Sequence, residues 1–178
     1  MLSIIIPCYN MERYLPQCID SLLDQNLNPA EFEIIIVNDE SKDSTLRVAN
    51  NYAAKHPNII VVDKKNAGVG AARNTGYDLA KRKIPREFMV STGIRFIEGK
   101  WMEDAILTSE IFLKAKRMAH VDYDVHRYRI LPTSAMRNKS PEHYNKVIFD
   151  NANAAYVFSE LIESVPNDHE NSIDVLKD

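Results

Sequence analysis

The sequence is poor in cysteine and glycine and has no long apolar run. Its 178 residues contain two cysteines and five glycines. Cys8 ends an apolar run and Cys18 occupies a core position of a helical pattern, which favours reduced thiols over a disulfide framework. The N-terminal apolar run stops at Pro7 without a basic flank, and no run approaches the ~18 residues of a membrane-spanning helix. These absences predict a cytoplasmic protein that is soluble or associates only peripherally with the inner face of a membrane.

Basic residues are too few to form a face that binds nucleic acid. The chain has 22 lysines and arginines against 25 acids, a net charge of -3 and a pI near 6.0. Binding to the phosphates of nucleic acid needs a dense basic surface, so nucleic acid is excluded as a partner. With 45% hydrophobic and 26% charged residues, the chain is long enough for one cored domain plus an appendage.

Three apolar runs have the β-branched composition of strands that are buried on both faces. They cover Ser3–Cys8, Phe32–Asn38 and Ile59–Val62. Helical patterns separate them, one opening at Glu12 and ending near Gln25, the other extending from about Ser44 to Lys55. Alternating strands and helices give parallel sheets with right-handed crossovers. We therefore predict an α/β fold, a three-layer α/β/α sandwich with a mainly parallel sheet.

The third strand is followed by a glycine-containing turn and a helix of small residues. Gly68 and Gly70 free the backbone before this helix, which bears Ala71, Ala72, Thr75, Leu79 and Ala80 and can approach its neighbours closely. The glycines do not form a dinucleotide fingerprint, because that motif has another spacing and belongs to the first strand-to-helix turn. An NAD site is therefore excluded.

A fourth strand is missing where the alternation requires one. Lys81–Lys83 lead into IPREFMV, which carries Pro85 and two charges in place of an apolar run. The sequence thus predicts a sheet that is truncated after the third strand-helix unit.

The second half of the chain has weaker patterns. We expect an extended piece from Gly93, a turn at Gly99, a helix opening near Glu103 and a strand over Val121–Leu131. A helical stripe extends from Val147 to Ile162 and ends before Pro166, with a frayed tail from Asn167. Its apolar side is expected to cover the core, with a second subunit or a membrane surface as alternatives.

Polar residues follow the second strand directly, with Asn38 and Asp39 at its carboxyl end. Ligands of open α/β sheets bind outside the carboxyl ends of the strands, so Asp39 is a candidate ligand-binding residue. The alternative is a plain turn in which Asp43 or Ser44 caps the next helix. Lys64, Lys65 and Arg73 gather positive charge near a helix N-terminus, which suits phosphate oxygens or is simply a solvated basic face.

Four ordered motifs resemble the family 2 glycosyltransferases of the GT-A fold. They are IIIPCYN with Glu12 and Leu15 behind it, IIIVNDESKDST, KNAGVGAARNTG and EGKWMEDAI. The resemblance covers about Leu2 to Ser134. It implies a Rossmann-like sheet that binds a nucleotide sugar, most often a UDP-sugar, and an inverting transfer to an acceptor hydroxyl, as in polysaccharide or glycan synthesis. It also implies domains at 1–135, with a nucleotide-binding half at 1–83 and an acceptor side at 84–135, and a helical extension at 136–178.

The resemblance assigns roles to individual residues. Pro7, Tyr9 and Glu12 match the loop around base and ribose, with Tyr9 stacking on the base. Asp39 matches the acid that reads the base edge, and Arg73 matches a residue near base and phosphates. Asp104 matches the general base, with Glu103 as its neighbour. The implied acceptor is a sugar, a lipid-linked molecule or a glycan, and a homodimer stays open.

Two positions depart from the family pattern. Glu40 stands where a glycine is usual, and the Asp-x-Asp pair for the divalent cation, Mg²⁺ or Mn²⁺, does not occur between Arg73 and Glu103. The pattern occurs only at Asp122 and Asp124, after the expected base. The alternative function is therefore a catalytically impaired nucleotide-binding or scaffold protein of the same family, and a purely structural α/β domain is a third reading.

Overall fold

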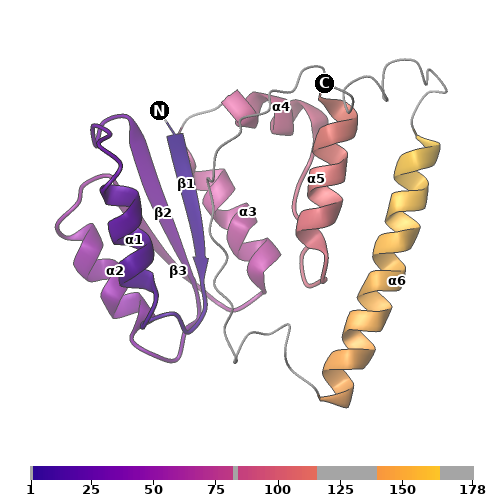
Figure 1. The fold of residues 1–178 in the computed structure, drawn as a ribbon, viewed down its shortest axis with the longest axis horizontal. Helices are drawn as coiled ribbons and strands as arrows, with labels where there is room; N and C mark the ends of the chain where they lie inside the picture. The colour runs from indigo at the N-terminus through magenta and orange to yellow at the C-terminus, as the bar shows by residue number, and fades with distance from the viewer. Residues whose placement is uncertain (1, 82–83, 116–139, 165–178) are drawn as a thin grey trace. The chain divides into compact units, whose positions relative to one another are not determined.

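A computed structural model describes residues 2–81, 84–115 and 140–164 (Figure 1). The described chain forms two compact units, residues 1–104 and 105–178, and each is treated by itself. The predicted strand Val121–Leu131, the pair Asp122 and Asp124 and the tail from Asn167 lie outside the described residues. The predicted domain boundary after residue 135 lies there too, so it stays a prediction.

The first unit is built on a parallel sheet in the order β1-β2-β3. Its strands are β1 (Leu2–Cys8), β2 (Phe32–Asp39) and β3 (Ile59–Lys64). Every residue of the central strand β2 is buried, as its unbroken Ile34–Val37 run requires for a strand covered on both faces. The register pairs Ile5 with Ile35 and Asp39 with Lys64. The predicted parallel sheet is thus confirmed, and the carboxyl ends of its strands share one edge.

Helices cover both faces of this sheet and make the predicted three layers (Figure 1). On one face, α1 (Leu15–Leu23) and α2 (Thr45–Ala53) pack against Ile34 and Ile36 through Ile19 and Ala49. On the other face, α3 (Val69–Leu79) packs Ala72 against Ile35 and Val37. Alternate residues of β2 therefore supply the two halves of the core.

Helix α3 lies unusually close to β1. A Cβ atom added at Gly76 would stand 2.4 Å from Cγ2 of Ile5, a distance that real side chains do not show. The glycine is needed here for close approach of a helix to a strand. This contact fixes the height of α3 above the sheet.

The chain forms a helix, α4 (Ile84–Thr92), where a fourth strand was missing. The sequence indicated the loss of this strand, because Pro85 and two charges stand in place of an apolar run, but it predicted no helix here. Proline is tolerated in the first turn of a helix, where backbone N–H groups have no intrahelical acceptor. After α4 the chain is extended to a turn at Gly99, whose φ of 72° lies in the left-handed region. In the described part of the chain, β1 is therefore an edge strand.

The remaining helices are α5 (Glu103–Lys114) and α6 (Pro141–Glu163). Helix α5 begins at the predicted residue. Helix α6 begins earlier than the apolar stripe indicated, because the Ser140 side chain accepts a hydrogen bond from His143 N and Pro141 occupies the first turn. Ile148 and Ile162, expected to face the core, are 65% and 71% exposed. Over the described ranges, no helix has the length and apolar character needed to cross a membrane.

Candidate functional site

The loops after β1 and β2 are joined to each other by side-chain hydrogen bonds. Asn10 Oδ1 accepts from Lys42 N at 2.8 Å, and Asn10 N donates to Ser41 Oγ at 2.9 Å. Glu12 makes a second reciprocal pair, accepting from Ser44 N at 2.7 Å and donating its own N–H to Asp43 Oδ2 at 3.1 Å. Two loops that are about 31 residues apart in sequence thus form one structural element at the carboxyl edge of the sheet.

Asp43 is the residue that caps α2. Its Oδ1 accepts from the N–H of Thr45 at 2.9 Å, whereas Ser44 at the cap position makes no side-chain capping bond. Burial alone would raise the pKa of Asp43, but hydrogen bonds from the Thr45 hydroxyl and from the Thr45 and Glu12 N–H groups lower that pKa overall. Of the two predicted caps, Asp43 is the one confirmed.

Asp39 organises the turn between β3 and α3. It is 4% exposed, and its Oδ1 accepts from Lys64 Nζ at 2.8 Å and from Ala67 N at 3.1 Å. Its Oδ2 accepts from Gly68 N at 2.9 Å, and its backbone oxygen accepts from the amide of Asn66. The carboxylate therefore stands at the expected edge, but it already holds the loop that leads into α3. A ligand reaching Asp39 would share or replace these donors.

Tyr9 is the residue of this edge best placed to stack on a ring. It follows β1, and 46% of its surface is exposed. Pro7 precedes it inside β1, in register with Val37 at the carboxyl end of the neighbouring strand. The structure therefore brings Pro7, Tyr9, Glu12 and Asp39 to one edge of the sheet. That they surround a nucleotide base stays a prediction.

The three basic residues do not form one cluster. Lys64 is engaged by Asp39, and Arg73 forms an ion pair with Glu103 while its guanidinium lies 5.1 Å from the centre of the Phe96 ring. Lys65 is exposed on the loop before α3. Charge available to phosphate oxygens at this turn is therefore smaller than the sequence indicated.

The neighbouring acids Glu103 and Asp104 have different surroundings. Glu103 is 7% exposed and is held by Arg73, so its charge is compensated. Asp104 is the next residue along α5 and is exposed. Of the two carboxylates, Asp104 is thus the one that a solvent-borne acceptor can approach.

Glu40 adopts a left-handed backbone conformation, with φ of 61°. Glycine adopts this conformation without penalty, whereas a side chain costs about 1 kcal/mol or more. The Glu40 carboxylate lies 3.4 Å from Lys42 Nζ, in an exposed pair, and accepts weakly from Asn66 N. The geometry therefore explains why a glycine would suit this turn.

The described residues do not fit a divalent metal ion. Within residues 2–81, 84–115 and 140–164, no group of three or more His, Cys, Asp or Glu side chains is arranged to hold one. Such ions are held through several oxygen ligands, so the described chain lacks the carboxylate set that the resemblance implies.

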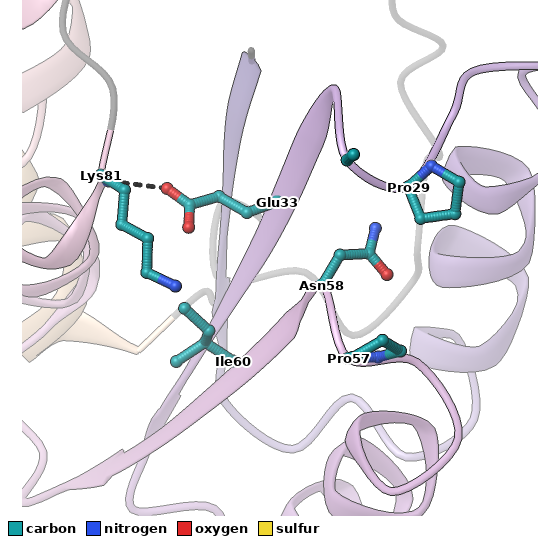
Figure 2. A pocket seen from close by; sticks show the side chains of 7 residues that line it. Pro29, Glu33, Pro57, Asn58, Ile60 and Lys81 are labelled. Carbon is teal, nitrogen blue, oxygen red and sulfur yellow. Dashed lines mark hydrogen bonds between the residues drawn. The ribbon is translucent and has the colours of Figure 1, made fainter.

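A separate cavity of about 330 Å³ opens at the opposite, amino edge of the sheet (Figure 2). Glu33, at the start of β2, is 2% exposed, and its Oε1 accepts from Ser3 Oγ and from Lys81 N at 2.8 and 2.7 Å. Its Oε2 is shielded from solvent and has no hydrogen-bond partner in the described residues, and Pro29, Pro57 and Ile60 line the cavity with it. We assign Glu33 a structural role in tying β1, β2 and the end of α3 together.

Sequence reasoning missed Asn10 and Asn74. Asn74 on α3 bonds the backbone of Phe96 in both directions. Asn10 has a positive φ of 54°, a conformation that asparagine adopts more readily than most residues. Its residue type is therefore a weak sign of a turn, and Asn74 has no comparable sign.

The N-terminal half of the chain is similar to a known protein family. Residues 3–84 match the sequence model described as Glycosyl transferase family 2. This range contains all three strands and α3, and it ends before Glu103 and Asp104.

Two relatives show how much of a longer protein this chain resembles. It is 40% identical over 82 residues to the poly(ribitol-phosphate) beta-glucosyltransferase of Bacillus spizizenii, a match covering 45% of this chain and 13% of the relative. It is 39% identical over 99 residues to EpsJ, an uncharacterized glycosyltransferase of Bacillus subtilis, covering 56% of this chain and 26% of the relative. The chain therefore matches only about a quarter or less of the length of these relatives.

Solved structures show the same fold. The crystal structure of S. aureus TarS aligns with a TM-score of 0.64 at 19% identity over 90% of this chain and 42% of TarS. The structure of a shorter TarS chain in complex with UDP-GlcNAc aligns with a TM-score of 0.59 at 21% identity over 65% of this chain and 54% of that one. These likenesses confirm a truncated, Rossmann-like GT-A fold. Over residues 3–84, the chain therefore combines this fold with a sequence similar to glycosyl transferase family 2.

Proposed function

We propose that this chain binds a nucleotide sugar, most readily a UDP-sugar, at the carboxyl edge of the sheet between Tyr9 and Asp39. The observation that carries the proposal is the convergence of Tyr9, Glu12 and Asp39 on loops that are bonded to one another. A stacking ring and an edge-reading carboxylate on preformed loops lower the ordering cost of binding. The TarS structure in complex with UDP-GlcNAc supports the choice of a uridine nucleotide.

The proposed reaction is glycosyl transfer with inversion. An acceptor hydroxyl loses its proton to the Asp104 carboxylate, its oxygen forms a bond to the anomeric carbon, and the bond from that carbon to the nucleotide diphosphate breaks. Asp104 supports this assignment because it is exposed, while Arg73 neutralises its neighbour Glu103. We propose an acceptor hydroxyl on a growing polysaccharide, in line with relatives named as a teichoic acid biosynthesis protein and a chondroitin synthase. A lipid-linked acceptor at the inner membrane face and a homodimer remain alternatives.

The second candidate function is nucleotide binding without efficient transfer. It is favoured by the lack of a metal-binding carboxylate set in the described ranges and by the engagement of Lys64 and Arg73 with carboxylates. General-base catalysis contributes roughly 10²- to 10⁴-fold, which does not replace stabilisation of a departing diphosphate. We therefore expect slow turnover in this chain.

The test uses a panel of UDP-sugars with purified chain and manganese titrated in. Turnover of the parent that is lost in Asp104→Asn supports transfer with Asp104 as base. The matched control is Asp24→Asn, which removes an exposed carboxylate at the C-terminal end of α1. Binding of UDP without turnover favours the second function. Turnover that survives in Asp104→Asn contradicts the assignment of the base.

A further inference from the structure

The segment between α4 and α5 rests on one side of α3. The contacts come from Gly70, Arg73 and Asn74, which occupy positions i, i+3 and i+4 and therefore share one face of the helix. They contact residues 96–103. The last of these, Glu103, is the first of the two acids that open α5. This face of α3, Gly70, Arg73 and Asn74, is called the docking face below.

Asn74 makes the most specific contact on the docking face. Its Oδ1 accepts from Phe96 N at 3.1 Å, and its Nδ2 donates to Phe96 O at 3.0 Å and to Glu98 Oε1 at 3.0 Å. The side-chain amide thus behaves as a peptide group of a neighbouring strand, satisfying both backbone groups of one residue. Such a two-way bond fixes the direction of the bound segment as well as its position.

The other two positions hold the same segment from either side. At Gly70, an added Cβ would stand 2.8 Å from the backbone oxygen of Ile97, so helix and segment approach as backbone to backbone. Arg73 pairs with Glu103 and covers the Phe96 ring. Replacing Gly70 or Arg73 would change packing or charge, whereas Asn74 contributes chiefly hydrogen bonds.

The N-terminus of helix α3 is held by the candidate nucleotide-binding edge. Gly68, the residue before α3, donates its N–H to Asp39, and Asn74 lies on the helix that follows. A single rigid helix therefore connects the residue expected to read the base with the segment that carries Asp104.

We propose that Asn74 is a positioning residue, which fixes the Phe96 backbone so that Asp104 stands at a set place relative to the bound nucleotide. The effect on catalysis that we expect from this inference rests on the proposed function. Asn74 does not touch the nucleotide in this account. A misplacement of a catalytic group by about 1 Å can cost around 10²-fold in rate, so a hydrogen-bonded clamp of this kind affects kcat strongly.

The experiment compares Asn74→Ala with Asp78→Asn. Asp78 lies on the same helix and contacts the same segment through Arg95, but in an exposed ion pair of the kind that contributes little. Amide hydrogen exchange of Phe96 is measured first. We expect it to accelerate about 5- to 10-fold in Asn74→Ala, the loss of one net hydrogen bond, and to stay unchanged in Asp78→Asn. An unchanged Phe96 amide in Asn74→Ala overturns the inference.

Activity supplies the second readout. In Asn74→Ala we expect kcat to fall roughly 10- to 100-fold while the dissociation constant for UDP stays within about twofold. A loss of UDP affinity that matches the loss of kcat overturns the inference, because Asn74 would then be a binding residue. If the parent shows no turnover, the proposed function fails, and exchange of the Phe96 amide still decides whether Asn74 holds the segment.

A double variant distinguishes the loss of specific hydrogen bonds at position 74 from general unfolding of Asn74→Ala. Asn74→Asp keeps the acceptor for Phe96 N but loses the donor to Phe96 O and faces the Glu98 carboxylate. Combining it with Glu98→Gln restores a donor-acceptor pair between positions 74 and 98. We expect the double variant to regain part of the Phe96 protection lost in Asn74→Asp, since the repulsion from Glu98 is removed while Phe96 O still lacks its donor. Equal exchange in the single and double variants contradicts the clamp.

Discussion

Asp39 and Lys64 end neighbouring strands in register, and Lys64 Nζ lies 2.8 Å from Asp39 Oδ1. The Asp39 side chain is 5% exposed and the Lys64 side chain 20%, so the pair is shielded from most solvent. Asp39 also accepts from Ala67 N and Gly68 N. The acid proposed to read the base is therefore also the residue that shapes the loop into α3, and its substitution should affect both stability and binding.

Asp39→Ala should lower the free energy of unfolding by about 1 to 3 kcal/mol, because two partly buried N–H groups and a lysine lose their acceptor. Denaturant titration measures the change. Asp78→Ala is the control, since it removes only an exposed ion pair and should cost less than about 1 kcal/mol. Equal stability of Asp39→Ala and parent would show that these bonds do not hold the loop.

Glu40→Gly should stabilise the chain by about 1 kcal/mol, because glycine adopts φ near 61° without steric cost. Glu40→Ala is the matched control: it removes the same charge but keeps a Cβ, so it should not stabilise. Both variants should bind UDP roughly two- to fivefold more tightly, since each removes a negative charge from the edge proposed to bind the nucleotide. Thermal unfolding and calorimetry measure the two effects. A Glu40→Ala variant as stable as Glu40→Gly would refute the backbone argument.

Gly76→Ala should destabilise the chain by about 1 to 3 kcal/mol, because the new methyl group would overlap Ile5 and force α3 away from β1. Alanine at Asn50, an exposed position of α2, controls for the general effect of alanine in a helix. A Gly76→Ala variant that melts at or above the temperature of the parent would contradict the close approach.

Acid should weaken the chain in part through Asp43. Hydrogen bonds hold the pKa of Asp43 below its ordinary value of 3.8 despite partial burial, so its contribution is present above 3.8 and is lost as pH falls through the lower, folded-state pKa. Asp43→Asn should therefore be less stable than the parent at neutral pH, and the difference should shrink below pH 3.8. Urea titrations at several pH values measure it, and a pH-independent difference would exclude this linkage.

The parallel core could be predicted because its signal is local. The Ile34–Val37 run and the helical spacing of Leu15, Ile19 and Leu22 each depend on a few consecutive residues. Helix α4 could not be predicted in this way, because proline is tolerated in the first turn of a helix but disrupts its middle, and the sequence alone does not show which position Pro85 occupies.

The edge residues were predicted from strand ends and family resemblance, but their bonding was not. Asn10 bonds a loop 31 or 32 residues away and Asn74 bonds Phe96, 22 residues away. Single polar residues with such distant partners carry no pattern in the sequence. The pairing of Arg73 with Glu103 could not be predicted from the sequence for the same reason.

The central claim is that a uridine nucleotide binds at the carboxyl edge of the sheet, and Tyr9 tests it most directly. Tyr9 is exposed after β1, and its side chain makes no hydrogen bond within the described part of the chain, so its substitution should spare the fold. Calorimetric titration of UDP into the parent, Tyr9→Phe and Tyr9→Ala is the measurement, with circular dichroism as the control for folding. Loss of base stacking should weaken UDP binding about tenfold in Tyr9→Ala and leave Tyr9→Phe close to the parent. Absence of UDP binding by the parent, or equal affinity in Tyr9→Ala, would contradict the account.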